Sequence, residues 1–71
     1  MKKIYLNRYR VIEYVMDNRL SFNDFFKKCK IGCYRGRQYI EDENKPITIR
    51  TLFKIARGMQ CSVNEIAVVG N

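Results

Sequence analysis

The sequence predicts an all-α fold, a compact bundle of about five short helices that forms one domain over residues 1–71. Apolar residues recur at spacings of three and four along most of the chain, which is the period of an amphipathic helix. Two stretches carry the Ser-x-x-acid pattern that is typical of a helix N-terminus. Glycine and proline are scarce, with four Gly and one Pro in 71 residues, and no segment is a convincing strand.

The first helix is expected from about Asn7 to Asp17, where apolar residues follow two neighbouring tracks. One track contains Tyr5, Tyr9, Ile12 and Met16, and the other contains Val11, Tyr14 and Val15. The second helix begins at Ser21, whose hydroxyl can accept a hydrogen bond from an amide one turn later. Its core face is Phe22, Phe25, Phe26 and Cys29.

A turn at Ile31-Gly32 precedes a third helix, from about Cys33 to Asp42. At 100° per residue, Cys33, Gly36 and Ile40 share one direction. The residues expected to point away are Tyr34, Arg35, Gln38, Tyr39 and Asp42. We therefore expect small residues to face inward and long polar and aromatic ones to face outward. Gly36 would let this helix approach the second one closely.

The fourth helix is expected to begin after Thr48, its predicted N-cap, and to bury a wide apolar stripe. The stripe is Ile49, Leu52, Phe53, Ile55, Ala56 and Met59. Gly58 lies near the C-terminal end, where glycine is favoured. A second capping box, Ser62-Val63-Asn64-Glu65, predicts a short fifth helix that ends near Val69.

The positive charge is concentrated in the first half of the chain. Residues 1–40 contain ten Lys or Arg and three acids, whereas residues 41–71 contain four of each. The formal net charge of +7 therefore belongs to the first half. Five cations and no acid lie between Lys27 and Arg37. Such a one-sided field suits a polyanion, most simply nucleic acid, although a solvated basic surface is the alternative.

The composition argues against several other classes of protein. No apolar run approaches the roughly 20 residues of a membrane span, so no membrane association is expected. The chain has three cysteines and no signal peptide after Met1-Lys2-Lys3, which favours reduced thiols and a cytoplasmic location. Without histidine, a metal site has little support. The acidic cluster Glu41-Asp42-Glu43 has no nucleophile or cofactor loop beside it, so we expect no enzyme activity, no cofactor and no small-molecule substrate.

Two helices joined by a tight turn, with a basic second helix, indicate a helix-turn-helix domain. The stretch from Thr51 to Ile66 resembles the closing half of the Cro/repressor (XRE-like) helix-turn-helix family. The shared features are the buried Ile55-Ala56 pair, an apolar residue three positions later and a short capped helix that ends in Glu-Ile. Ile40-Glu41 resembles the pair that closes the recognition helix of that family. The resemblance covers residues 5–67 and implies a lambda-repressor-like fold.

This chain departs from the family at four places. The turn glycine of the family would fall near Lys30, whereas this chain has Gly32. The glycine usually found two residues after the closing glutamate is Glu43. The helix-1 arginine that often pairs with that glutamate aligns with Val15. Glu41-Asp42-Glu43 also places acids where family members approach the DNA backbone.

The resemblance implies a sequence-specific regulator of transcription, a repressor, that binds double-stranded DNA. Its recognition helix, about 33–42, would lie in the major groove. The implied base-contacting residues are Tyr34, Arg35, Gln38 and Tyr39. Arginine pairs with guanine and glutamine with adenine, while the tyrosines can instead pack against neighbouring helices. The implied phosphate-contacting residues are Ser21, Asn23, Lys27, Lys28, Lys30, Arg37 and Thr48, of which Ser21 and Thr48 can also serve only as helix caps.

Such domains usually bind DNA as two-fold dimers, and the fifth helix with Val68-Val69-Gly70-Asn71 is the expected dimer surface. The alternative function is a helix-turn-helix module that binds a protein, as an antitoxin or an antirepressor does, with little or no DNA binding. A third possibility is non-specific binding of RNA or single strands, which uses aromatic side chains along a basic groove.

Overall fold

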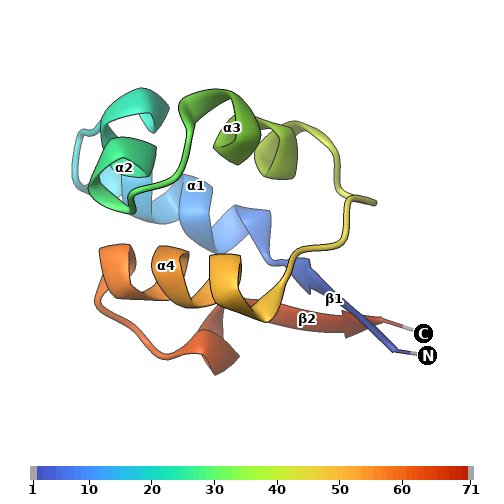
Figure 1. Cartoon of the computed structure of the whole chain (residues 1–71). Helices are drawn as coiled ribbons and strands as arrows, with labels where there is room; N and C mark the ends of the chain where they lie inside the picture. The colour runs from blue at the N-terminus through green and yellow to red at the C-terminus, as the bar shows by residue number, and fades with distance from the viewer. Residues whose placement is uncertain (1, 71) are drawn as a thin grey trace.

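The computed structural model describes residues 2–70 as one small unit with the helices packed around a common core (Figure 1). In chain order its elements are β1 (Lys3–Leu6), α1 (Arg8–Asp17), α2 (Phe22–Lys28), α3 (Cys33–Glu41), α4 (Ile49–Met59), the 3-10 helix η1 (Val63–Glu65) and β2 (Ala67–Gly70). Four of the five predicted helices are therefore present, with bounds within about two residues of those expected.

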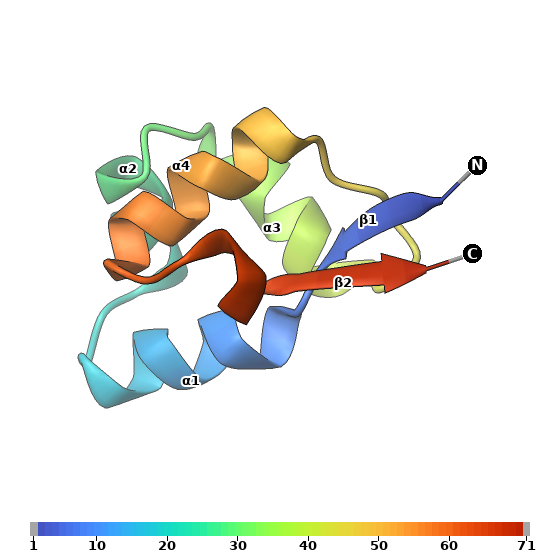
Figure 2. The same ribbon diagram turned by 90° about the horizontal axis from the view of Figure 1, so that it is seen from below.

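The predicted all-α fold, a bundle of about five helices, is wrong at both ends of the chain. β1 and β2 pair as an antiparallel sheet in which Tyr5 lies opposite Val68 (Figure 2). Residues 2–70 thus form a small α+β fold, with four α-helices and one two-stranded sheet. The physical reason is that β-branched Val68 and Val69 lose side-chain freedom in a helix, whereas they and Tyr5 suit a pleated strand.

The expected fifth helix is limited to the single turn η1. Its capping box is confirmed, because Ser62 N donates to Glu65 Oε2 at 3.1 Å and the Ser62 side chain accepts from the amide of Glu65. The next residue, Ile66, is fully buried, and its carbonyl accepts a hydrogen bond from Asn7 N at 2.8 Å. The chain is thereby turned from the helix into the strand.

The core is built from one face of each helix. The largest fully buried side chains are Phe25, Phe26, Leu52, Ile55, Ile66 and Val11. Only one of the two apolar tracks of α1 is buried, since Tyr9 is 67% exposed and Met16 is 72% exposed. The α4 stripe is likewise narrower than predicted, because Ile49 and Phe53 are exposed.

The predicted N-caps of α2 and α4 are confirmed. Ser21 Oγ accepts from Asp24 N at 3.1 Å, and Thr48 Oγ1 accepts from Thr51 N at 3.2 Å. The glycine near the end of α4 has a different role from the expected one. Gln60 supplies the left-handed C-cap of α4, with φ 57°, whereas Gly58 is buried inside the helix against the Cys29 side chain.

α3 approaches α2 closely because Gly36 has no side chain. A Cβ added at Gly36 would lie 2.5 Å from two atoms of the Phe26 ring, which is fully buried. Figure 1 shows the two helices together on the side of the molecule away from the strands. The expectation that Gly36 permits this approach is confirmed.

Gly36→Ala is therefore expected to destabilise the protein. The added methyl must displace a buried aromatic ring, and overpacking of this kind costs about 1–3 kcal/mol. Gly32→Ala is the matched control, because Gly32 has φ −58° and no atom within 4 Å of an added Cβ. Urea unfolding should show a larger loss of stability for Gly36→Ala than for the control, in which alanine replaces only the N-cap glycine of α3. Equal stabilities of the two variants would contradict the close approach.

Candidate nucleic-acid interface

The turn between α2 and α3 contains a left-handed residue at Lys30. Its φ is 61°, in the region that glycine favours, whereas Gly32 has an ordinary φ of −58°. Lys30 therefore occupies the conformation expected of a turn glycine, so the glycine at Gly32 does not displace the turn. Ile31 follows as a buried residue and donates its amide to Phe26 O at 3.0 Å.

The close packing at Gly36 determines which side of α3 faces the interior. Gly36 and Tyr39 are buried, and Cys33 and Ile40 are half-buried. The prediction that Tyr39 points outward is wrong, because its side chain is only 4% exposed. Tyr39 follows Gly36 by three residues, so it lies on the same side of the helix, one turn further on.

The opposite side of α3 presents long side chains to solvent. Tyr34 is 80% exposed, Arg35 and Arg37 are exposed, and Gln38 is half-buried. Three of these residues line a hollow of about 470 Å³ between α2 and α3. Its lining is Asn23, Cys33, Tyr34, Arg37, Gln38 and Glu41. Of the four predicted base-contacting residues, Tyr34 and Gln38 line this hollow, Arg35 is exposed outside it, and Tyr39 is buried.

The predicted phosphate-contacting cations are not equivalent. Lys27 and Lys30 are exposed near the turn. Lys28 reaches toward α1 instead, where its Nζ donates to the Tyr14 hydroxyl at 3.1 Å and lies 5.6 Å from the ring centroid. Arg37 forms an exposed ion pair with Glu41 at 3.7 Å. The hydroxyls of Ser21 and Thr48 cap their helices, while Asn23 lines the hollow.

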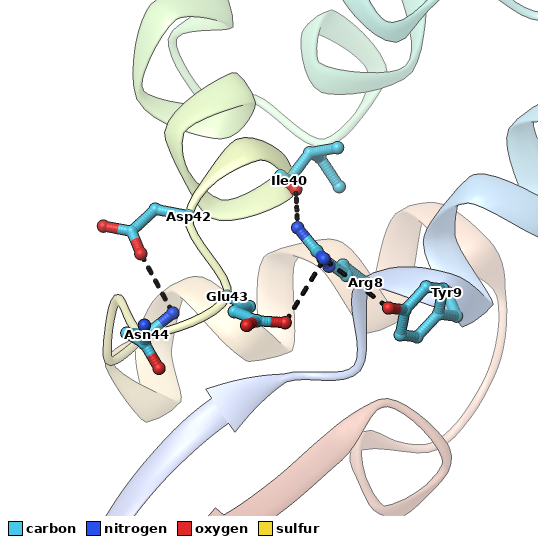
Figure 3. A network of polar contacts seen from close by, with 6 residues as sticks. All are labelled: Arg8, Tyr9, Ile40, Asp42, Glu43 and Asn44. Atoms are coloured by element: carbon cyan, nitrogen blue, oxygen red, sulfur yellow. Dashed lines mark hydrogen bonds and ion pairs between the residues drawn. The ribbon is translucent and has the colours of Figure 1, made fainter.

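The three acids at the C-terminal end of α3 and directly after it are each engaged within the chain. Glu41 pairs with Arg37, and Asp42 Oδ1 accepts a hydrogen bond from Asn44 N at 2.9 Å. Glu43 Oε2 lies 3.3 Å from Arg8 Nη2 (Figure 3). The negative charge that follows the exposed helix is therefore partly compensated by neighbouring groups.

Arg8 is the structural residue of this region that the sequence did not indicate. From the start of α1 its Nη1 donates to Ile40 O at 2.9 Å, which satisfies a carbonyl in the last turn of α3 (Figure 3). The hydrogen bond with Tyr9 and the nearby charges of Glu43 and Asp42 raise the pKa of Arg8. The resemblance aligned the helix-1 arginine of the family with Val15, so a partner for Glu41 had to come from elsewhere in the chain. The signal in the sequence that could have indicated this contact was Arg8 itself, a cation at the N-terminal end of α1.

The three cysteines are free thiols, and residues 2–70 contain no cluster of three or more Cys, Asp or Glu side chains that would hold a metal. Cys29 is buried, and this burial raises its pKa to about 11. Cys33 is half-buried, and its thiol donates to Asn23 O at 3.6 Å. In the described part of the chain, every helix is too short or too polar to cross a membrane.

Comparison with known proteins gives no relative for this chain. No protein-family model matches it, and no curated protein or solved structure matches it significantly.

Arg8→Met is expected to lower the melting temperature, because it leaves the Ile40 carbonyl without its side-chain donor. The loss of about one hydrogen bond in a domain of this size corresponds to ~4–8 °C. Glu43→Gln should have a smaller effect, since Glu43 is 67% exposed and an exposed ion pair contributes little. Thermal unfolding followed by circular dichroism measures both. An Arg8→Met protein that melts with the wild type would contradict this role.

Cys29 is expected to resist thiol reagents in the folded protein. With a pKa of about 11, on the order of one thiol in a thousand is ionised at pH 8, and the thiolate is the reactive form. Raising the pH toward 11 increases the reactive fraction. Cys33 and Cys61, which are half-buried, should react first. Mass spectrometry after timed labelling checks the order, with guanidinium-unfolded protein as the control in which all three react. Equal rates in the native state would disprove it.

Proposed function

We propose that this protein is a sequence-specific regulator of transcription that binds double-stranded DNA through the exposed face of α3. The observation that carries the proposal is the orientation of α3. Gly36 packs on Phe26, and the opposite side presents Tyr34, Arg35, Arg37 and Gln38. The major groove of B-DNA is wide enough for one α-helix with such side chains.

The electrostatic arrangement supports this proposal. Lys27 and Lys30 are exposed around the turn, and Arg37 is exposed along one edge of the outward face of α3. Cations in these positions suit the phosphates on both sides of a groove, which fix position rather than sequence. The acids nearby are engaged by Arg8, Arg37 and a backbone amide, so they oppose the approach of DNA less than isolated charges would.

The base-reading roles are assigned to the first turns of α3. Recognition helices of this type contact base edges with their N-terminal residues. Arg35 is proposed to pair with guanine O6 and N7, and Tyr34 to contact a thymine methyl or a phosphate. Gln38 follows one turn later. Tyr39 is buried and supports the helix from beneath, so it has no proposed contact with a base.

The proposed active form is a homodimer on a two-fold symmetric site, formed through the C-terminal tail. The surface differs from the expected one, because Ala67–Gly70 form the strand β2 and not a helix, while Asn71 lies outside the described residues. Val68 and Val69 are both exposed on this strand, next to an edge that offers backbone hydrogen bonds. A repressor of this size would act in the cytoplasm, where three free thiols remain reduced.

A protein-interaction module is the second candidate, and one feature of the structure favours it. Ile49 and Phe53 are exposed one turn apart on α4. Phe53 also lines an open hollow of about 630 Å³ between α4 and η1, together with Val63 and Arg57. An apolar surface of this kind can contact another protein.

Two substitutions separate base reading from phosphate contact. Arg35→Ala should lower the affinity for a selected duplex by about tenfold or more, the discrimination of one bidentate pair, and leave scrambled duplexes nearly unaffected. Lys27→Ala should weaken both duplexes alike and reduce the slope of log K against log salt by about 1. Selection from a random duplex library supplies the cognate sequence, and fluorescence anisotropy measures the affinities.

The same measurements identify the outcome that would sink the proposal. A library that yields no enriched sequence argues against a specific regulator. If binding is then weak but depends on salt, non-specific binding of nucleic acid is the better description. If no nucleic acid binds, the exposed face of α4 becomes the first surface to test.

A further inference from the structure

The side chain of Gln38 on α3 is hydrogen-bonded to Lys45. The Lys45 ammonium lies in the loop after α3 and donates to Gln38 Oε1 at 2.9 Å. It also lies 5.5 Å from the centroid of the Tyr39 ring, over a side chain that is buried. Lys45 is half-buried and held by two groups, so its position is more restricted than that of an exposed surface lysine.

The chemistry of this contact fixes the orientation of the amide. An ammonium group has three donors and no acceptor, so the atom facing it must be the amide oxygen and not the amide nitrogen. The Nε2 group, with its two hydrogens, is then the free end of Gln38. Gln38 lines the hollow on the outer side of α3, where a base edge would lie in the proposed complex.

An unrestrained glutamine pairs with adenine through both ends of its amide. Nε2 donates to adenine N7, and Oε1 accepts from the N6 amino group. In this protein Oε1 already accepts from Lys45. Its second lone pair can take another donor, but that donor would lie beside a positive charge. Guanine presents two acceptors, O6 and N7, and requires no acceptor from the protein.

We propose that Lys45 sets the base preference of Gln38, making it a hydrogen-bond donor that selects guanine over adenine. This inference rests on the proposed DNA-binding function and adds a specificity-determining residue outside the recognition helix. Arg35 and Gln38 would then both read guanine. The preferred half-site should be richer in guanine than the side chains of α3 alone would indicate.

The test is selection from a random duplex library with four proteins: wild type, Gln38→Ala, Lys45→Met and Lys45→Arg. The base pair at which Gln38→Ala loses its preference is the one that Gln38 reads. At that position the wild type should enrich guanine over adenine by about tenfold, and Lys45→Met should shift the ratio toward adenine by about the same factor. Lys45→Arg retains a donor to Oε1 and should keep the wild-type preference. The loss of one charge in Lys45→Met weakens binding to all sequences alike, so any change in the ratio of guanine to adenine comes from the lost hydrogen bond to Gln38 Oε1.

The outcomes distinguish this inference from the function on which it rests. If the wild type enriches no sequence, both fail. If it enriches a sequence that is unchanged in Lys45→Met, or in Gln38→Ala, only the role of Lys45 and Gln38 fails. A wild-type preference for adenine at the position that Gln38→Ala identifies would overturn the inference.

Discussion

The close contact between Gly36 and the Phe26 ring is the constraint on which the rest of the candidate interface depends. It brings α3 against α2 without an intervening side chain, so it sets how α3 is rotated about its own axis. That rotation places Tyr39 in the core and Tyr34 in solvent. A helix held by larger side chains would lie further from α2. The outward orientation of Tyr34 and Arg35 is therefore a consequence of the missing side chain at Gly36.

Near that contact, several cations are paired with acceptors close to the end of α3. Arg8 connects α1 to the end of α3, and Arg37 lies along α3 beside Glu41. Lys45 joins the following loop to Gln38. Each contact places a cation against an acceptor at the C-terminal half of α3, where helix carbonyls are also oriented outward. In the N-terminal half of α3 and the turn before it, the basic side chains remain exposed. The positive charge is therefore concentrated at the N-terminal end of α3, because the cations near its C-terminal end are paired with acceptors.

The helices were predictable from the sequence because their signals are local. Ser21 and Thr48 cap the helices they were expected to cap, and Gly36 serves the close approach inferred from its position. The sheet was not predictable in this way, since Tyr5 and Val68 are partners only across nearly the whole chain. Each four-residue strand is too short to show a period of its own.

The misplacement of Tyr39 has a similar cause. The spacing of α3 alone admits several rotations, and only the position of the Phe26 ring selects one. The sequence thus predicted which helix carries the candidate site, but not the direction in which every side chain of that helix points. The contact of Arg8 with the Ile40 carbonyl joins a side chain of one helix to the backbone of another. A backbone acceptor is present at every residue, so the pattern of side chains in the sequence cannot predict such a contact.

The pairing of β1 with β2 bears on the kinetics of folding. Helices and the turn between α2 and α3 need only neighbours in the chain, and such elements form within microseconds. Pairing Lys3 with Gly70 closes a loop that includes every helix. Closing this loop costs conformational entropy before any hydrogen bond between the strands forms. We therefore expect the sheet to form after the helices.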